Sequence, residues 1–407
     1  MNAGTRECNM MHATKILLLI FTLLVAGCGG GDPSVHSDLP RGVTADTIII
    51  GSHTDLSAHL AIWGVPMTNG IRMRFAEVNA AGGIHGRSID FLVEDSQYQV
   101  PLAVKATNKL IHVGQIFAML GAMGTPQNNA VFERMFAANV PSMFPLTAAL
   151  SMYEPLHPLK FSYFVSYRNQ ARGGISYMVE HYGYKNVCLQ TMATDYGAEI
   201  ELGFEQAVEE LDLTVTYVGR HKGSETDFTG TITKIKNSGC EFLFLGPFIK
   251  DTILLYTAAR DAGWEGAIVA NMVPYLPEIP AAADGGMNGF YAVAPFFVPD
   301  FLNEEIEDPW IAEWYAAYTQ TYGDEPAAQS VIGYVIADLL VRALTAAGPD
   351  LTVEKMLSSL EAIEHYEDPF GGPSLSFSAT KHVASNYLNL YQVVDEKWVT
   401  VAAAIPY

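Results

Sequence analysis

The sequence is poor in cysteine and in basic residues. Of its 407 residues only 4 are cysteine, and 23 Lys and Arg stand against 44 Asp and Glu, which gives a formal net charge of −21. A surface with this excess of negative charge repels nucleic acid and anionic lipid head groups. We therefore expect no nucleic-acid partner.

Motifs that mark common classes of enzyme are also absent. The chain contains no G-x-S-x-G, no G-x-x-x-x-G-K-[ST] and no H-E-x-x-H, the patterns of a hydrolase nucleophile, a phosphate-binding loop and a zinc-binding helix. We expect no enzymatic activity, no cofactor and no bound metal.

The apolar run near the N-terminus is short, and no later stretch reads as long and apolar enough to span a bilayer. Arg6 and Lys15 precede the apolar residues 16–25, which are too few for a membrane-spanning helix of about 20 residues. A charged start followed by a short apolar core is typical of an export signal. We predict that residues 1–27 are such a signal and that the mature protein works outside the cytosol.

Cys28 follows directly on small residues at the end of this segment. The arrangement resembles the lipobox of bacterial lipoproteins, so we predict that Cys28 becomes lipidated and anchors the protein to a membrane, in the periplasm or at the cell surface. The alternative is an ordinary secretory signal with an incidental cysteine. Residues 28–42, rich in glycine and polar side chains, would tether the lipid to the folded body.

Beyond residue 43, short β-rich runs alternate with helical patterns, which is typical of parallel sheets covered by helices. We predict strands at 47–51, 89–94, 117–121, 141–144, 187–190, 214–218, 242–245, 267–270, 290–293, 387–393 and 397–401. Helices are predicted at 66–81, 101–114, 126–138, 196–211 and 228–237, in a segment ending at 262, and at 309–322, 329–347 and 352–363.

The strands and helices fall into two successive series of similar length, which predicts an α/β protein with two Rossmann-like lobes. Helices that return after the second series imply that the chain goes back to complete the first lobe. We assign residues 43–165 and 292–382 to lobe 1, and residues 166–291 and 383–407 to lobe 2. Cys188 and Cys240, both at the start of predicted strands, are either free thiols or a disulfide.

Several local strings, in order along nearly the whole mature chain, resemble one family. They are IIG at 49–51, the segment 57–64, NAAGGIHG at 79–86, EDS at 94–96, GAMGTP at 121–126, DYG at 195–197, TDFT at 226–229 and the strand-helix unit at 244–263. The family is that of the type I periplasmic binding proteins of branched-chain amino acid transport, the leucine/isoleucine/valine-binding group. The resemblance implies parallel sheets in two lobes, a hinge of three crossings, a small-molecule ligand and the permease subunits of an ABC transporter as partners. We expect a monomer.

Thr125 is the first candidate site residue. Followed by Pro126, it fits the cap of a helix that begins after a strand, where free N–H groups attract a carboxylate. Capping alone is the alternative. The resemblance implies that the Thr125 hydroxyl, with backbone groups of Ala148 and Ala149, binds the carboxylate of a ligand.

Aromatic candidates lie on both predicted lobes. Trp63, in the loop after the first strand, offers a large apolar surface to a ligand, although a surface or core position is the alternative. The resemblance implies that Tyr196 and Phe248 face the ligand from the opposite lobe, Tyr196 with its phenol and Phe248 with its ring alone. His53 and His59 flank the first loop and either line the entrance or are exposed polar residues.

One position departs from the family. Members that bind α-amino acids place an acidic residue after a strand of the second lobe, to pair with the ammonium group, whereas the matching residue here is Met272. A buried cation needs an opposing charge, and a thioether does not supply one. An α-amino acid is therefore a poor ligand unless Asp195 or Asp251 supplies the charge instead. We therefore expect a carboxylate or amide with an apolar or aromatic body. Branched-chain amino acid binding, or ligand sensing for a separate signalling partner, is the alternative.

Overall fold

The computed structural model describes residues 39–284, 286–296, 299 and 306–407, which belong to a unit running from Leu39 to Tyr407. The predicted export signal at 1–27, the lipidation site Cys28 and most of the predicted tether lie outside the described residues.

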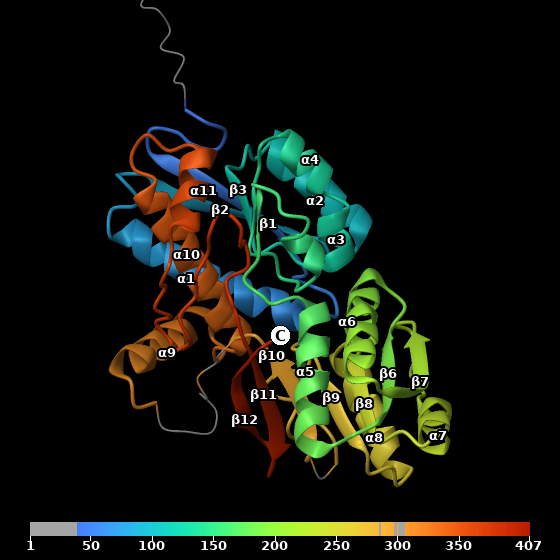
Figure 1. Cartoon of the computed structure of the whole chain (residues 1–407). Helices are drawn as coiled ribbons and strands as arrows, with labels where there is room; N and C mark the ends of the chain where they lie inside the picture. The colour runs from blue at the N-terminus through green and yellow to red at the C-terminus, as the bar shows by residue number, and fades with distance from the viewer. Residues whose placement is uncertain (1–38, 285, 297–298, 300–305) are drawn as a thin grey trace, which may run out of the picture. The chain divides into compact units, whose positions relative to one another are not determined.

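A parallel five-stranded sheet comes from the first series (Figure 1). Its order is β2-β1-β3-β4-β5, with β1 Thr47–Thr54, β2 Ser88–Asp95, β3 Ala118–Leu120, β4 Ser142–Met143 and β5 Lys160–Phe161. The helices between these strands are α1 Ala61–Ala80, α2 Val100–His112, α3 Thr125–Asn129 and α4 Phe132–Ala137. The single helix predicted at 126–138 is thus two short helices.

The second sheet has seven strands in the order β12-β11-β10-β9-β8-β6-β7. They are β6 Asn186–Met192, β7 Thr214–His221, β8 Phe242–Gly246, β9 Ala267–Ala270, β10 Phe290–Ala294, β11 Leu388–Val394 and β12 Lys397–Ile405. The first five are parallel, and β11 and β12 add to the edge in antiparallel fashion. Strand β8 is buried along its whole length, as expected for a parallel strand with both faces covered.

The helices of the second sheet are α5 Tyr167–Tyr182, α6 Asp195–Leu211, α7 Thr229–Asn237 and α8 Ile249–Asp261. The sequence analysis did not predict α5. Two adjacent glycines at 173 and 174 lower its helix propensity, but its ends are well defined. Ser166 caps the start by accepting the Asn169 N–H at 3.1 Å, and Gly183 ends the helix in the left-handed conformation.

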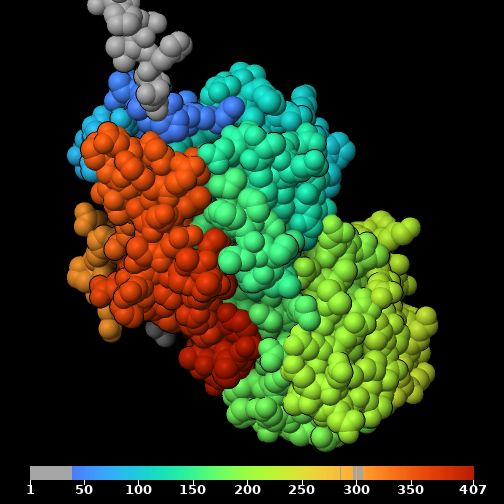
Figure 2. Space-filling model, turned by 45° about the horizontal axis from the view of Figure 1, so that its top comes forward, coloured from blue at the N-terminus to red at the C-terminus, as the bar shows by residue number. Residues whose placement is uncertain are grey.

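The C-terminal helices return to the first sheet. They are α9 Pro309–Tyr322, α10 Ala328–Ala346 and α11 Val353–Glu361, and the orange surface that contains them adjoins the blue and teal surface of the first series in Figure 2. The chain thus passes between the sheets after β5, after β10 and before β11. Strand β10 continues past the crossing expected at residue 291, to Ala294. Two of the crossings run side by side, because the Ser162 N–H donates to the His382 carbonyl at 2.8 Å.

One detail differs from the expectation from the sequence, and a second resolves an alternative that the sequence left open. Helix α10 is long and apolar enough to cross a membrane, yet nearly all of it is buried in the protein as a core helix. Cys188 in β6 and Cys240, which lies just before the neighbouring strand β8, form a disulfide with their Cα atoms 6.0 Å apart.

Helices α1 and α10 pack with their backbones nearly touching. A Cβ atom at Gly333 would lie 2.1 Å from the Met67 carbonyl oxygen, and one at Gly70 would lie 2.0 Å from that of Ser330. Only glycine fits at either position. This contact joins the N-terminal and C-terminal parts of the first lobe.

We expect Gly333→Ala to lower the free energy of unfolding by about 1–3 kcal/mol, because the methyl group forces the two helices apart. Gly230→Ala is the matched control, since a Cβ at this position of helix α7 meets nothing within 4 Å. It should be neutral or stabilising by up to about 1 kcal/mol. Urea unfolding of both variants measures the difference, and equal stabilities would contradict the packing argument.

Candidate functional site

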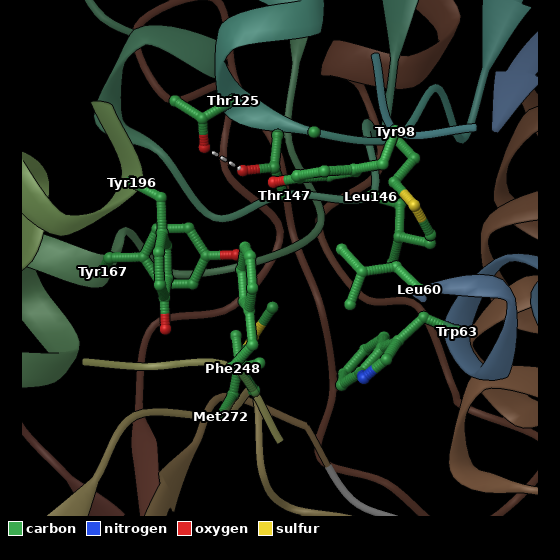
Figure 3. A pocket seen from close by; sticks show the side chains of 13 residues that line it. Leu60, Trp63, Tyr98, Thr125, Leu146, Thr147, Tyr167, Tyr196, Phe248 and Met272 are labelled. Atoms are coloured by element: carbon green, nitrogen blue, oxygen red, sulfur yellow. Dashed lines mark hydrogen bonds between the residues drawn. The ribbon is translucent and has the colours of Figure 1, made fainter. Parts of the chain in front are cut away.

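A cavity opens at the carboxyl ends of the strands. Its empty volume is about 430 Å³, including the part open to solvent. Its wall is formed by Leu60, Trp63, Tyr98, Met123, Gly124, Thr125, Leu146, Thr147, Tyr167, Tyr196, Phe248, Met272 and Val273 (Figure 3). Each lies in a segment that follows a strand of one of the two sheets, which is where open α/β sheets bind ligands.

The apolar part of the wall contains three predicted site residues. Trp63 belongs to the first turn of α1 rather than to a loop, and it is buried. Phe248 precedes α8, and Met272 follows β9. Figure 3 shows Trp63 on one side of the cavity and Phe248 with Met272 on the other.

The Phe248 ring connects aromatic residues of both lobes. It stacks on Tyr196 with centroids 5.5 Å apart, and it meets Tyr98 and His59 of the first lobe at 5.8 Å each. His59 is exposed, so it lies at the edge of this cluster. His53 is fully buried, and both predictions for it were wrong. Burial lowers the pKa of His53 to about 4, so its imidazole is neutral at neutral pH.

The polar part of the wall centres on Thr125. Its hydroxyl hydrogen bonds to that of Thr147, with the oxygens 2.7 Å apart, and both side chains are buried. Thr125 does not cap its helix as predicted, because Gly124 occupies the cap position and Thr125 is the first helical residue. Helix α3 has only 5 residues, so its dipole contributes little and the hydroxyl is the group that a ligand can use.

Ala148 and Ala149 lie next to Thr147 but are fully buried and are not part of the cavity wall. Their carbonyls already accept hydrogen bonds, that of Ala148 from the Tyr167 N–H at 2.6 Å and that of Ala149 from the Met152 N–H at 3.0 Å. These two carbonyls are therefore engaged within the protein, and a carboxylate, which only accepts hydrogen bonds, would need the backbone N–H groups instead.

The Tyr196 side chain presents its ring to the cavity. Its hydroxyl donates to the Pro247 carbonyl at 3.2 Å and accepts from the Asn271 amide at 2.9 Å. The phenol predicted to bind a ligand is thus engaged inside its own lobe. These bonds fix the ring between Phe248 and Tyr167, whose centroid is 4.8 Å away.

None of the cavity-lining residues carries a formal charge. Three carboxylates could in principle pair with an ammonium group of a ligand, but each has other partners or is exposed. Asp55 is buried but accepts three backbone N–H groups, including that of Leu60 at 2.9 Å. Asp251 is buried, and its carboxylate oxygen lies 3.2 Å from a ring nitrogen of His221. Asp195 is exposed at the start of α6. Within the part of the chain that the structure describes, no carboxylate thus takes the place of the acidic residue that Met272 replaces.

Several wall residues were missed by sequence reasoning, namely Leu60, Tyr98, Met123, Gly124, Leu146, Thr147, Tyr167 and Val273. Most follow strands that were predicted, so extending the search to every segment after a strand would have found Tyr98, Thr147 and Val273. Tyr167 opens helix α5, which was not predicted.

The two-sheet fold and the cavity agree with the family that the sequence matches. The family model described as periplasmic binding protein matches residues 47–397 of the chain. The chain belongs to this family. Within it, the relatives place this periplasmic binding protein in the type I, leucine/isoleucine/valine-binding group. The family consists of solute-binding proteins rather than enzymes, and it works outside the cytoplasm.

Three relatives illustrate the range of the group. The Leucine-, isoleucine-, valine-, threonine-, and alanine-binding protein of Pseudomonas aeruginosa is 22% identical over 331 residues, 81% of this chain and 86% of the relative. A fatty acid ABC transporter substrate-binding protein from Thermomonospora curvata shares the fold with a TM-score of 0.80 and 22% identity, covering 91% of this chain and 95% of that one. A solute-binding protein of an ABC transporter from R. palustris, in complex with benzoate, gives a TM-score of 0.75 and 17% identity, covering 88% and 97%.

Proposed function

We propose that this periplasmic binding protein delivers a small carboxylate or amide with an apolar or aromatic body to the permease subunits of an ABC transporter. The observation that carries the proposal is the uncharged wall of the cavity, with threonine hydroxyls in one region and Trp63, Phe248 and Met272 in another. Such a cavity suits a ligand with one polar end.

The missing carboxylate argues against an α-amino acid. Moving an ammonium group out of water costs several kcal/mol unless an anion or a set of acceptors replaces the lost hydration. A carboxylate can be held by hydrogen bonds alone, because two or three donors stabilise its charged form. The benzoate and fatty acid named for two structural relatives are ligands of this kind.

We propose Trp63, Thr125, Tyr196, Phe248 and Met272 as ligand contacts. Ala148 and Ala149, predicted together with them, do not line the cavity. The two lobes, with the second extended from residue 291 to Ala294 at the end of β10, close about their crossings. Closure is stabilised only to the extent that the ligand contacts both lobes. Thr125 would hold the polar end for the first lobe, while Phe248 would cover the apolar body for the second.

Branched-chain amino acid binding is the second candidate, favoured by the names of relatives from Pseudomonas aeruginosa and Brucella abortus. A ligand at a hundred times its dissociation constant adds about 2.7 kcal/mol to the free energy of unfolding. We expect thermal unfolding to shift upward with benzoate, phenylacetate or hexanoate, or with their amides, but not with leucine or valine. A shift with leucine alone would establish the second candidate instead.

Replacing Thr125 by Val should weaken binding of the acid that stabilises best by about fivefold to tenfold, because one net hydrogen bond of about 1–1.5 kcal/mol is lost. Thr107→Val is the matched control, since Thr107 is buried in α2 and its hydroxyl has no partner among the described residues. The control should bind normally. Titration calorimetry compares them, and equal affinities would remove Thr125 from the site.

The lipid anchor on Cys28 is part of the proposal. In cells that process lipoproteins, Cys28→Ser should move the protein from the membrane fraction to the soluble fraction, because a thioether-linked lipid can no longer form. Fractionation followed by immunoblotting measures this. An unchanged distribution, or mass spectrometry showing an unmodified Cys28 in the native protein, would contradict the anchor.

A further inference from the structure

Two tyrosines that sequence reasoning missed meet the polar part of the cavity from different lobes. Tyr98 lies in the turn after β2, and Tyr167 is the first residue of α5. Figure 3 shows the Tyr98 ring extending toward the Thr125–Thr147 pair with its hydroxyl end foremost. The phenols of Tyr98 and Tyr167 are close enough for the charge of one to affect the other.

Tyr98 is held firmly in this position. Gln97 and Tyr98 both adopt the left-handed backbone conformation, with φ of 48° and 53°. The Tyr98 carbonyl accepts the Gln127 side-chain amide at 2.6 Å. Gly124 leaves room for the ring, because a Cβ there would lie 2.9 Å from Tyr98 Cε2. A ring fixed in this way loses little conformational freedom when a ligand binds.

The Tyr98 hydroxyl has no hydrogen-bond partner among the described residues. The Tyr196 hydroxyl, in contrast, makes two hydrogen bonds. Burial, and then the neighbouring Tyr167, Asp195 and Asp55, raise the pKa of the Tyr98 phenol, which keeps its proton. Tyr98 is half-buried and lines the cavity, so its hydroxyl is free to donate to an acceptor on a ligand that enters there.

The neighbouring Tyr167 phenol is also protonated. Burial raises its pKa, while hydrogen bonding with the Ala148 backbone and the Thr147 side chain lowers it. Tyr98, Tyr167, Thr125 and Thr147 thus bring four hydroxyl groups to one region. Two carboxylates, Asp195 and Asp55, raise the pKa of the Tyr98 phenol, and Asp195 is exposed to solvent. Asp55 has its charge balanced by backbone N–H groups.

We infer that the Tyr98 hydroxyl donates a hydrogen bond to the head group of the ligand and that this head group is a carboxylate, an inference that rests on the function proposed above. A hydrogen bond to an ionised oxygen is about twice as strong as one between neutral groups. A primary amide also brings N–H donors that need acceptors of their own. Tyr98 is therefore a residue that selects acids over the corresponding amides.

The test compares Tyr98→Phe with the wild type by titration calorimetry, using benzoate and hexanoate and their primary amides. Tyr98→Phe keeps the ring contact with Phe248 and removes only the unpartnered hydroxyl. We expect acid affinity to fall about tenfold to a hundredfold, and the preference for acid over amide to fall with it. Tyr184→Phe, in a tyrosine that stacks on Phe242, is the matched control and should bind as the wild type does.

Tyr98→Leu serves as a second variant that retains apolar contact but no hydroxyl, and it should lose the same preference. If the wild type binds an acid and Tyr98→Phe binds it within twofold, the inference is overturned while the proposed function stands. If the wild type binds none of the acids or amides, both fail together. A uniform loss for acid and amide alike would assign Tyr98 to packing and would also overturn the inference.

Discussion

The cavity wall without a charged side chain is the constraint on which the rest of the site depends. Any ligand that enters must leave its hydration shell, so its polar end has to be satisfied by neutral donors and acceptors. The chain meets this demand with the paired hydroxyls of Thr125 and Thr147. Backbone carbonyls nearby and the Tyr196 phenol are already committed, so few groups are left free, and these few determine which ligands fit.

Most of the fold could be predicted from the sequence, because buried parallel strands and their covering helices have strong periodic patterns. The order of the strands within each sheet was not predicted, because it depends on pairing between separate segments and not on a local pattern. What was missed depends on tertiary contacts. Helix α5 contains two glycines, and strand β5 has only 2 residues, paired with the 2-residue β4. Neither gives a local signal.

The site was predictable where a residue immediately follows a recognised strand. Thr125, Phe248 and Met272 each follow such a strand and were indicated by the resemblance to the family, and all three line the cavity. Their detailed bonding was not predictable, because the partner of the Thr125 hydroxyl is Thr147, which lies in the segment after a different strand. Tyr98 was missed because it reaches the cavity through two consecutive residues in the left-handed backbone conformation. The local sequence does not predict that conformation.

The close approach of α1 and α10 through Gly70 and Gly333 also bears on how a newly made chain acquires its structure. All five parallel strands of the second sheet come from one continuous stretch, from Asn186 to Ala294. In the first lobe, α1 packs on β2 close to it in the sequence, but its contact with α10 forms only when residues up to Ala346 are present. The first lobe is therefore completed by a contact between segments from opposite ends of the chain.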